Sequence, residues 1–339
     1  MTQLYRPSRV YFEPHALDYP LGRKIYDQVR AERIPIAMTT KHNQVRDIPG
    51  KTVKEAYAQA KQTLVVGVRR TLKFQTSKPS ADYALPLVTG CPGHCQYCYL
   101  QTTLGPRPFV RIYVNLDEIL QQAGEIIAKR GQKTVFEGSC VSDPVPLERY
   151  TGALAASIAF FAGQPNGYFR FVTKYDEVDS LLSIDHGGHT EIRFSLNAET
   201  PIRLYEHAVP GLEERLKAAR KVYDAGYPLG FLIAPIFVYD GWQTEYRKVL
   251  ERISQYFNGV PGLSFELITH RFTPRAKKLI LARYPGSKLP MAEEDRVWKY
   301  GQFGYGKYLY PQETRDQVKE FFTDMIHASF ESPIIRYSI

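Results

Sequence analysis

The sequence has no run of eighteen or more apolar residues, so it offers no candidate for a membrane-spanning helix. Its first residues, MTQLYRPSRVYFEPH, also lack the apolar stretch of a secretory signal. No internal repeat or low-complexity tract is visible, and a hydrophobic content of 44% argues against global disorder. We therefore expect a cytoplasmic protein with a sizeable core and no membrane partner.

Cysteine is scarce in this chain, and most of it is concentrated in one loop. Of the 339 residues only four are cysteine, and three of these, Cys91, Cys95 and Cys98, fall within eight residues. In a reducing compartment, clustered thiols are more often metal ligands or catalytic groups than disulfides. The loop CPGHCQYCYL (91–100) is therefore the first candidate for a functional site.

Acidic residues are in deficit at the N-terminal end of the chain. Residues 1–80 carry 15 Lys and Arg against 6 Asp and Glu, and the other residues carry 29 of each sign, so this segment accounts for the whole net charge of +9. A second excess lies in 271–310, where nine basic residues accompany three acidic ones. Basic segments suit a polyanion such as nucleic acid, but charge alone fits a solvated surface equally well.

The two ends of the chain differ in pattern from its middle. Residues 1–80 are predicted to form a basic, mainly helical N-terminal extension, with amphipathic helices over 21–33 and 52–64. Residues 271–339 form a C-terminal region after the regular pattern stops. Its predicted elements are a hairpin in KYGQFGYGKYLY (299–310), where alternation surrounds a glycine, and a closing amphipathic helix (312–330).

Between these ends, residues 81–270 alternate short apolar runs with amphipathic segments. Strands that alternate with helices imply right-handed βαβ units and a parallel sheet. Six such units fit a partial (β/α)6 barrel or a doubly wound sheet, and both place the active site at the carboxyl ends of the strands. The predicted strands are 84–88, 134–138, 168–174, 191–197, 228–238 and 263–268, and the predicted helices are 115–131, 147–163, 211–226 and 245–257.

The cysteine loop has the spacing C-x3-C-x2-C, and three interpretations are open. Inert buried thiols are common, but three within eight residues of a Pro-Gly-containing loop cannot all point into one core. A structural zinc site needs four ligands; His94 is the nearby candidate, but it directly precedes Cys95, and the chain has no second C-x2-C pair. An iron–sulfur cluster held by three thiolates would leave one iron open for a substrate or cofactor.

The loop and its surroundings resemble the radical S-adenosylmethionine (SAM) superfamily. C-x3-C-x2-C after the first strand of an α/β repeat is typical of that superfamily, and CPGHCQYCYLQTTLG with GSCVSDP downstream is similar to the spore photoproduct lyase family. The resemblance implies a radical SAM barrel, with a [4Fe–4S] cluster on Cys91, Cys95 and Cys98 and SAM on the open iron. It further implies a DNA-repair lyase that reverses 5-thyminyl-5,6-dihydrothymine through a 5′-deoxyadenosyl radical and regenerates SAM.

The fourth cysteine, Cys140, lies in EGSCVSDP, just past the second predicted strand. Single cysteines are commonly buried and inert, but the carboxyl ends of strands face the reaction chamber in this architecture. The resemblance implies that Cys140 donates a hydrogen atom to a substrate radical, a role that needs a thiol and not a thiolate. Tyr97 and Tyr99 flank Cys98 and are expected to return a hydrogen to 5′-deoxyadenosine, with aromatic packing as the alternative for both.

Four polar residues lie at or just after predicted strand ends and are expected to bind SAM. Lys174 suits the carboxylate, and Ser142, Ser195 and Asn197 suit the ribose hydroxyls. The sequence departs from the superfamily at one point, because FEGSC stands where Gly-Gly-Glu usually follows the second strand. The SAM contacts of that segment are therefore left open.

A lesion stacked inside duplex DNA has to be flipped out before a radical inside a barrel can reach it. Arg271, Lys299 and Lys307 are expected to grip phosphates, and Tyr305, near the tip of the predicted hairpin, to act as a wedge or stacking platform. A surface hairpin without contacts is the alternative. The expected partners are ultraviolet-damaged DNA and an electron donor such as a flavodoxin or ferredoxin, and by resemblance the protein would work in the spore core.

Two other functions stay open on the sequence alone. One is a different radical SAM enzyme acting on RNA or a small molecule, which a second cysteine-rich motif would favour; the chain has none. The other is a non-catalytic DNA-binding module whose loop holds zinc in a closed site.

Overall fold

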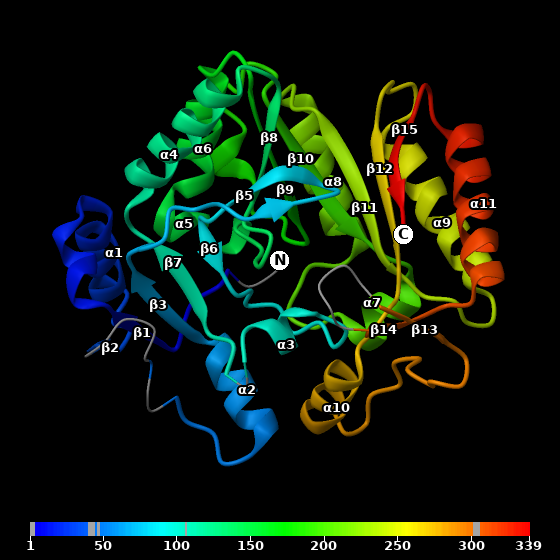
Figure 1. Ribbon diagram of the computed structural model, residues 1–339, viewed down its shortest axis with the longest axis horizontal. Helices are drawn as coiled ribbons and strands as arrows, with labels where there is room; N and C mark the ends of the chain where they lie inside the picture. The colour runs from blue at the N-terminus through cyan, green and yellow to red at the C-terminus, as the bar shows by residue number, and fades with distance from the viewer. Residues whose placement is uncertain (1–3, 40–44, 46–47, 106, 301–305) are drawn as a thin grey trace.

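The computed structural model describes residues 4–39, 45, 48–105, 107–300 and 306–339. Two largely parallel sheets and one hairpin form its strand framework, and helices surround the larger sheet (Figure 1). None of the helices in these ranges combines the length and the apolar character that crossing a membrane requires.

The larger sheet has the strand order β15-β12-β11-β10-β9-β8-β5-β4. Six of its strands are the six predicted ones, and each pairs in parallel with the next one along the chain. The sheet curls into part of a barrel (Figure 1), so the predicted partial (β/α)6 barrel is confirmed. The six strands are β5 (Ala81–Leu85), β8 (Thr134–Gly138), β9 (Gly167–Thr173), β10 (Thr190–Leu196), β11 (Leu229–Ile236) and β12 (Ser264–Thr269).

Each edge of this sheet carries a strand that the alternation does not predict. At one edge β4 (Thr76–Ser77) pairs antiparallel with β5. At the other edge β15 (Ile334–Ser338) pairs in parallel with β12, after the chain has returned through its last helix. A strand of two residues is too short to produce a recognisable period, and β15 lies after the last helix, outside the stretch in which strands and helices alternate.

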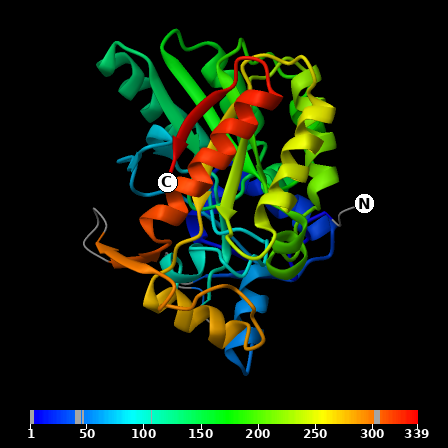
Figure 2. The same ribbon diagram turned by 90° about the vertical axis from the view of Figure 1, so that its right-hand side faces the viewer.

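Helices cover the outer face of the larger sheet (Figures 1 and 2). The predicted helices are present with small shifts at their ends, except that the one predicted over 147–163 is divided. Gly152 adopts a left-handed φ of 60°, which ends one short helix before the next begins. The helices are α4 (Leu116–Arg130), α5 (Glu148–Thr151), α6 (Ala153–Ala162), α8 (Leu212–Asp224), α9 (Trp242–Tyr256) and α11 (Gln312–Ser329).

The N-terminal region corrects the expectation of a mainly helical extension. Its two predicted helices are present, but it also supplies three parallel strands to a second sheet of order β2-β1-β3-β7-β6. All five residues of the central strand β3 are buried, and the sequence pattern misses it because its start continues the period of the preceding helix. The elements are β1 (Arg9–Phe12), α1 (Pro20–Ala31), β2 (Ile36–Met38), α2 (Val53–Lys61), β3 (Thr63–Gly67), β6 (Val88–Thr89) and β7 (Val110–Tyr113).

The predicted hairpin of the C-terminal region consists of β13 (Val297–Tyr300) and β14 (Gly306–Leu309). Its tip, which includes Tyr305, lies outside the described residues. Backbone hydrogen bonds in both directions between Phe272 and Tyr308 tie the hairpin to the chain that follows β12. The hairpin therefore lies beside the carboxyl ends of the barrel strands.

The interior of the partial barrel holds an ion network in addition to apolar side chains. Arg193, whose side chain is 2% exposed, donates hydrogen bonds to Glu137 and, at 2.7 Å, to Glu266. Arg170 donates to the other oxygen of Glu266, and Ser80 donates to Glu137 at 2.6 Å. Because these residues come from β8, β9, β10, β12 and the β4–β5 turn, the network connects strands across the barrel.

Replacing Arg193 by Met should destabilise the protein by about 3–5 kcal/mol, because Glu137 and Glu266 would lose one of the two buried arginines that compensate their charge. The measurement is the free energy of unfolding in urea. Arg220→Met is the matched control: its ion pair with Asp224 is 41% and 54% exposed, so it should change stability by less than about 1 kcal/mol. Equal effects of the two substitutions would contradict the prediction.

Candidate active site

The cysteine loop follows β6 and leads into the short helix α3 (Leu100–Thr103) at the mouth of the barrel. Its backbone is fastened to the segment that follows α7 (Glu199–Tyr205). The amide of His94 donates to the carbonyl of His207 at 2.8 Å, and the amide of Gln96 donates to the carbonyl of Tyr205 at 2.8 Å. The loop is thus held against the chain that leaves β10.

Helix α10 (Pro274–Arg283) closes on the loop from the other side, together with α2. The fully buried Arg283 donates to the carbonyl oxygen of Gln101 at 2.9 Å and to its side-chain oxygen at 3.1 Å. Gln101 in turn donates to the carbonyl of Cys95 at 3.2 Å. The C-terminal region therefore helps to fix the geometry of the cysteine loop.

The three thiols of the loop lie close enough to influence one another's charge. Burial raises the pKa of Cys91 to about 12, an effect that Lys61 opposes and Cys98 increases. Burial likewise raises the pKa of Cys95, and both other thiols add to this shift. The protein alone therefore favours neutral thiols at Cys91 and Cys95, and bound metal would be needed to hold these two residues as thiolates.

The surroundings of these thiols fit an iron–sulfur cluster. The amide of Gly93 points to Cys91 Sγ at 3.4 Å, the kind of sulfur hydrogen bond that tunes a cluster. A Cβ atom at Gly93 would lie 2.9 Å from Val209 Cγ1 and 3.2 Å from Tyr175 Oη, so a larger residue would crowd this side of the loop. In the described part of the chain, no three His, Cys, Asp or Glu side chains lie close enough together to bind a single metal ion. An iron–sulfur cluster does not require such a group, because each of its thiolates binds a different iron atom.

His94, the alternative zinc ligand, is engaged elsewhere. Its ring packs edge-on against Tyr57, with 5.7 Å between the ring centroids. Burial lowers the pKa of His94 to about 4, with Lys61 adding to the effect. A neutral, packed imidazole is the ordinary state of a histidine in a protein interior.

Cys140 lies in the turn directly after β8, at the same edge as the cysteine loop. Its Sγ is 2.9 Å from Ser77 Oγ, and the hydroxyl of Tyr99 donates to its backbone carbonyl oxygen. Burial, together with the nearby carboxylate of Glu137, raises the pKa of Cys140 to about 11. Cys140 is therefore a neutral thiol whose turn is connected to the cysteine loop through one tyrosine.

A buried carboxylate, Glu206, organises the predicted residues on the opposite side of the mouth. It accepts hydrogen bonds from Tyr97, from Lys174 at 3.1 Å and from Arg215 at 2.5 Å. Lys174 also donates to Ser195 Oγ at 2.8 Å. Although burial opposes its charge, Arg215 and Lys174 lower the pKa of Glu206 to about 2, so it is an anion at neutral pH.

The other two predicted SAM contacts bond to nearby protein groups. Ser142 Oγ donates to the carbonyl of Gly90, which links the Cys140 turn to the start of the cysteine loop. Asn197 is fully buried, donates to the carbonyl of Pro235 at 3.0 Å and accepts from the Tyr246 hydroxyl at 2.8 Å. Asn197 therefore lies within the wall of the barrel, while Lys174 and Ser195 lie together at its mouth.

The predicted DNA contacts among the described residues gather around the hairpin. Lys299 and Lys307 are directly opposed across its two strands, and burial and the charge of Arg271 both lower the pKa of Lys307. Trp298 and Tyr300 on β13 are 38% and 73% exposed. The hairpin thus combines cations with exposed aromatic rings, which is the combination that nucleic-acid-binding surfaces use.

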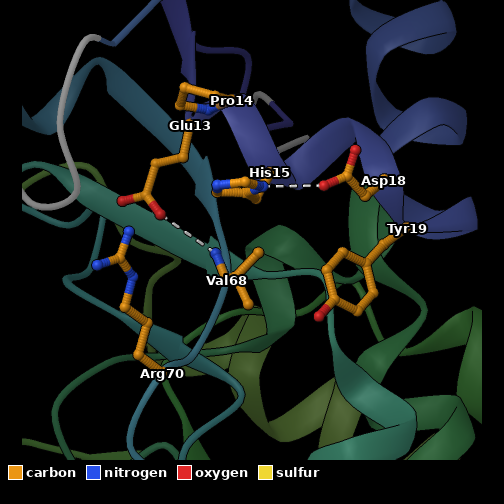
Figure 3. Close-up of a pocket in the computed structure, with 7 residues that line it drawn as sticks. All are labelled: Glu13, Pro14, His15, Asp18, Tyr19, Val68 and Arg70. Carbon is orange, nitrogen blue, oxygen red and sulfur yellow. Dashed lines mark hydrogen bonds and ion pairs between the residues drawn. The ribbon is translucent and has the colours of Figure 1, made fainter.

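A separate pocket of about 520 Å³ lies at the carboxyl ends of β1 and β3 in the N-terminal sheet and contains none of the predicted site residues (Figure 3). Glu13, on its wall, pairs with the buried Arg111 at 2.7 Å and accepts from the amide of Val68. His15 contacts Asp18 at 3.0 Å. Because its carboxylates are engaged within the protein, we do not include this pocket in the candidate active site.

Sequence reasoning missed Glu206, Arg215 and Asp143, which support the predicted residues. Arg215 has a detectable signal, because it shares the apolar face of its predicted helix with Ala219 and Val222, four and seven positions on. Asp143 lies in the quoted GSCVSDP string but carries no periodic signal. In the structure it accepts hydrogen bonds from Thr173 and from the amide of Lys174, each at 2.8 Å.

Comparisons with known proteins give one consistent result. Residues 5–339 match the family model described as spore photoproduct lyase. Curated proteins named spore photoproduct lyase are 47% identical in Clostridium acetobutylicum, over 100% of both chains, and 48% identical in Geobacillus sp. (strain Y412MC61), over 98% of both. A solved structure of a spore photoproduct lyase mutant with bound AdoMet and dinucleoside spore photoproduct has a TM-score of 0.97 and 46% identity, and covers 99% of this chain and 100% of that one.

Replacing Glu206 by Gln should lower the free energy of unfolding at neutral pH by about 3 kcal/mol, because Arg215 and Lys174 would lose their anion. The pKa of Glu206 is about 2 in the folded state against an ordinary 4.5, so the contribution is present above pH 4.5 and is lost as the pH falls through 2. Urea unfolding at several pH values should therefore show that the difference in unfolding free energy between the variant and the parent protein becomes smaller as the pH falls from 4.5 to 2. Glu125→Gln, at an exposed position on α4, should show no such trend.

Proposed function

The chain belongs to the spore photoproduct lyase family, and we propose that it repairs DNA by reversing 5-thyminyl-5,6-dihydrothymine to two thymines. The solved relative that holds AdoMet and dinucleoside spore photoproduct supports this cofactor and this substrate. In the present chain, the proposal is carried by the contact between the Tyr99 hydroxyl and the backbone of Cys140. It joins the cysteine loop to the one thiol outside that loop, at the mouth of the barrel.

The residues of the mouth divide into those that would hold the cofactors and those that would move hydrogen atoms. Cys91, Cys95 and Cys98 would hold a [4Fe–4S] cluster, and Lys174 with Ser195 would face the polar groups of SAM. When bound and reduced, the cluster and SAM supply the 5′-deoxyadenosyl radical that removes the hydrogen from C6 of the dihydrothymine half. An external one-electron donor such as a flavodoxin or ferredoxin completes the proposal.

Cys140 would act on the substrate after this hydrogen is removed. The methylene bridge between the two bases then breaks, and the unpaired electron remains on the methyl carbon of one thymine. Because an S–H bond is weaker than a C–H bond, transfer of the Cys140 hydrogen to this carbon is downhill and leaves a thiyl radical. The pKa of about 11 supports the assignment, since it keeps the hydrogen on the sulfur at neutral pH.

The two tyrosines would relay a hydrogen atom from 5′-deoxyadenosine to Cys140. This direction is the opposite of the one expected from the sequence, because 5′-deoxyadenosine has to lose a hydrogen before SAM can form again. In the proposed sequence, the Cys140 thiyl takes the phenolic hydrogen of Tyr99, the resulting phenoxyl takes that of Tyr97, and Tyr97 recovers one from the methyl group of 5′-deoxyadenosine. The contact of Tyr99 with the Cys140 carbonyl supports the first step. Burial and Glu206 raise the pKa of Tyr97 well above its ordinary value, which keeps its phenol protonated and able to take part.

The hairpin would hold the DNA from which the lesion is flipped. Lys299, Lys307 and Arg271 supply positive charge for phosphates, and Trp298 and Tyr300 supply exposed rings that could stack against unpaired bases. We extend this proposal to Tyr305 at the tip, whose position in the sequence lies between the two strands.

Reconstituted, reduced protein should convert a dinucleotide spore photoproduct to two intact thymines in the presence of SAM, as measured by chromatography and mass spectrometry. Cys140→Ala should retain its iron, but its yield of the normal product should be lower by a factor of about ten or more, because other species would trap the methyl radical. Cys140→Ser, which restores a polar group but no weak S–H bond, should behave in the same way. Loss of iron from either variant would identify Cys140 as a ligand and contradict its role as donor.

Removing one phosphate contact should change the salt dependence of DNA binding. For Lys299→Ala we expect the slope of log Kd against log salt concentration to fall by about 1, with similar losses for damaged and undamaged DNA. Fluorescence anisotropy at several salt concentrations measures this slope. Lys129→Ala, an exposed lysine on α4, is the matched control and should leave the slope unchanged; an unchanged slope for Lys299→Ala would exclude it as a phosphate contact.

A further inference from the structure

Lys61 is a buried lysine that the function described above does not use. It is the last residue of α2, and only 1% of it is exposed. Its ammonium group donates a hydrogen bond to the backbone carbonyl of Cys91 at 2.7 Å. The same group lies 5.4 Å from the centre of the Tyr57 ring, one helical turn earlier on the same face of α2. A positive charge is therefore fixed directly behind the first cysteine of the loop.

This charge has no anionic partner among the described side chains. The contacts of its ammonium group are the Cys91 carbonyl and the Tyr57 ring, both of which are neutral. By contrast, the buried Arg193 and Arg215 each contact at least one carboxylate. An isolated buried charge is costly, so buried cations in proteins are normally paired with anions.

An iron–sulfur cluster on the cysteine loop would supply the negative charge that Lys61 lacks as a partner. Three thiolates on a [4Fe–4S] cluster leave a net negative charge, and one-electron reduction adds another. The hydrogen bond of Lys61 to the backbone of Cys91 also places its charge within electrostatic reach of that residue's sulfur. A cation held in a low-dielectric interior stabilises the more negative of two redox states.

We propose that Lys61 is the counter-charge of the iron–sulfur cluster and raises its reduction potential, so that the cluster accepts an electron more readily. This inference rests on the part of the proposed function that assigns a cluster to Cys91, Cys95 and Cys98. It makes Lys61 a tuning residue that acts through the cysteine loop, because its ammonium group lies against the backbone of Cys91. Its location on α2 gives the N-terminal region a direct influence on the chemistry of the barrel.

The test compares Lys61→Met, which removes the charge and retains most of the side-chain volume, with Lys61→Arg, which retains the charge. Lys54→Met is the matched control, because it removes the same charge from an exposed position on the same helix. After reconstitution, iron and sulfide are counted, and the cluster is titrated against potential by electron paramagnetic resonance. For Lys61→Met we expect the ratio of reduced to oxidised cluster at a fixed potential to fall about tenfold, equivalent to about 59 mV for one electron. Lys61→Arg and Lys54→Met should remain close to the parent protein.

A fully loaded Lys61→Met protein with the parent midpoint potential would overturn the proposal. If Lys61→Met does not retain a cluster, the proposal is tested by comparing the urea midpoints of unfolding of the metal-free variant and the metal-free parent. Removing an uncompensated buried charge should leave the metal-free variant at least as stable as the metal-free parent, whereas a lower midpoint would identify Lys61 as a purely structural residue and overturn the proposal. Absence of iron from the parent protein would instead contradict the assignment of the cluster itself, so the two failures are distinguishable.

Discussion

The buried carboxylate of Glu206 is the point at which three parts of the barrel mouth meet. Tyr97 of the cysteine loop, Lys174 after β9 and Arg215 of α8 all donate hydrogen bonds to it. Because the carboxylate is buried, each contact is worth more than at a surface, and the loss of any one leaves charge or hydrogen-bonding capacity uncompensated. Glu206 therefore adds a side-chain connection between the cysteine loop and the strands to the backbone hydrogen bonds of His94 and Gln96, although it has no chemical role of its own in the proposed reaction.

The partial barrel that brings these parts together could be predicted from the sequence, because its strands and helices follow a repeating pattern. Six apolar runs separated by amphipathic segments predict six parallel strands, and parallel strands bring Cys140, Lys174 and Ser195 to one edge of the sheet. The strands of the N-terminal sheet escaped prediction because β1 and β2 are only four and three residues long, too short to establish a period.

The residues that support the site were harder to predict from the sequence. A buried charged residue is identified by the groups that it contacts in the structure, and its spacing in the sequence does not reveal them. Arg215 could have been noticed as a cation on an apolar helix face, but its partner Glu206 lies in an irregular segment with no period. Lys61 falls on the same face of its helix as the buried Tyr57, yet the other lysine of α2, Lys54, is exposed, so residue type alone does not distinguish Lys61 from a surface lysine. In each case the contact that defines the role of the residue joins positions that are distant in the sequence and adjacent only in the folded protein.

The mouth of the barrel imposes opposite requirements on chemically identical side chains. Burial raises the pKa of Cys140 and of Cys91, to about 11 and about 12, so the protein environment alone favours neutral thiols at both positions. In the proposed reaction, hydrogen-atom donation by Cys140 needs that state, whereas ligation of iron by Cys91 needs a thiolate. The difference between the two roles therefore cannot come from burial. We propose that it comes from what lies next to each sulfur: Cys140 contacts a serine hydroxyl, whereas Cys91 shares its loop with two further cysteines and has the ammonium group of Lys61 behind its backbone.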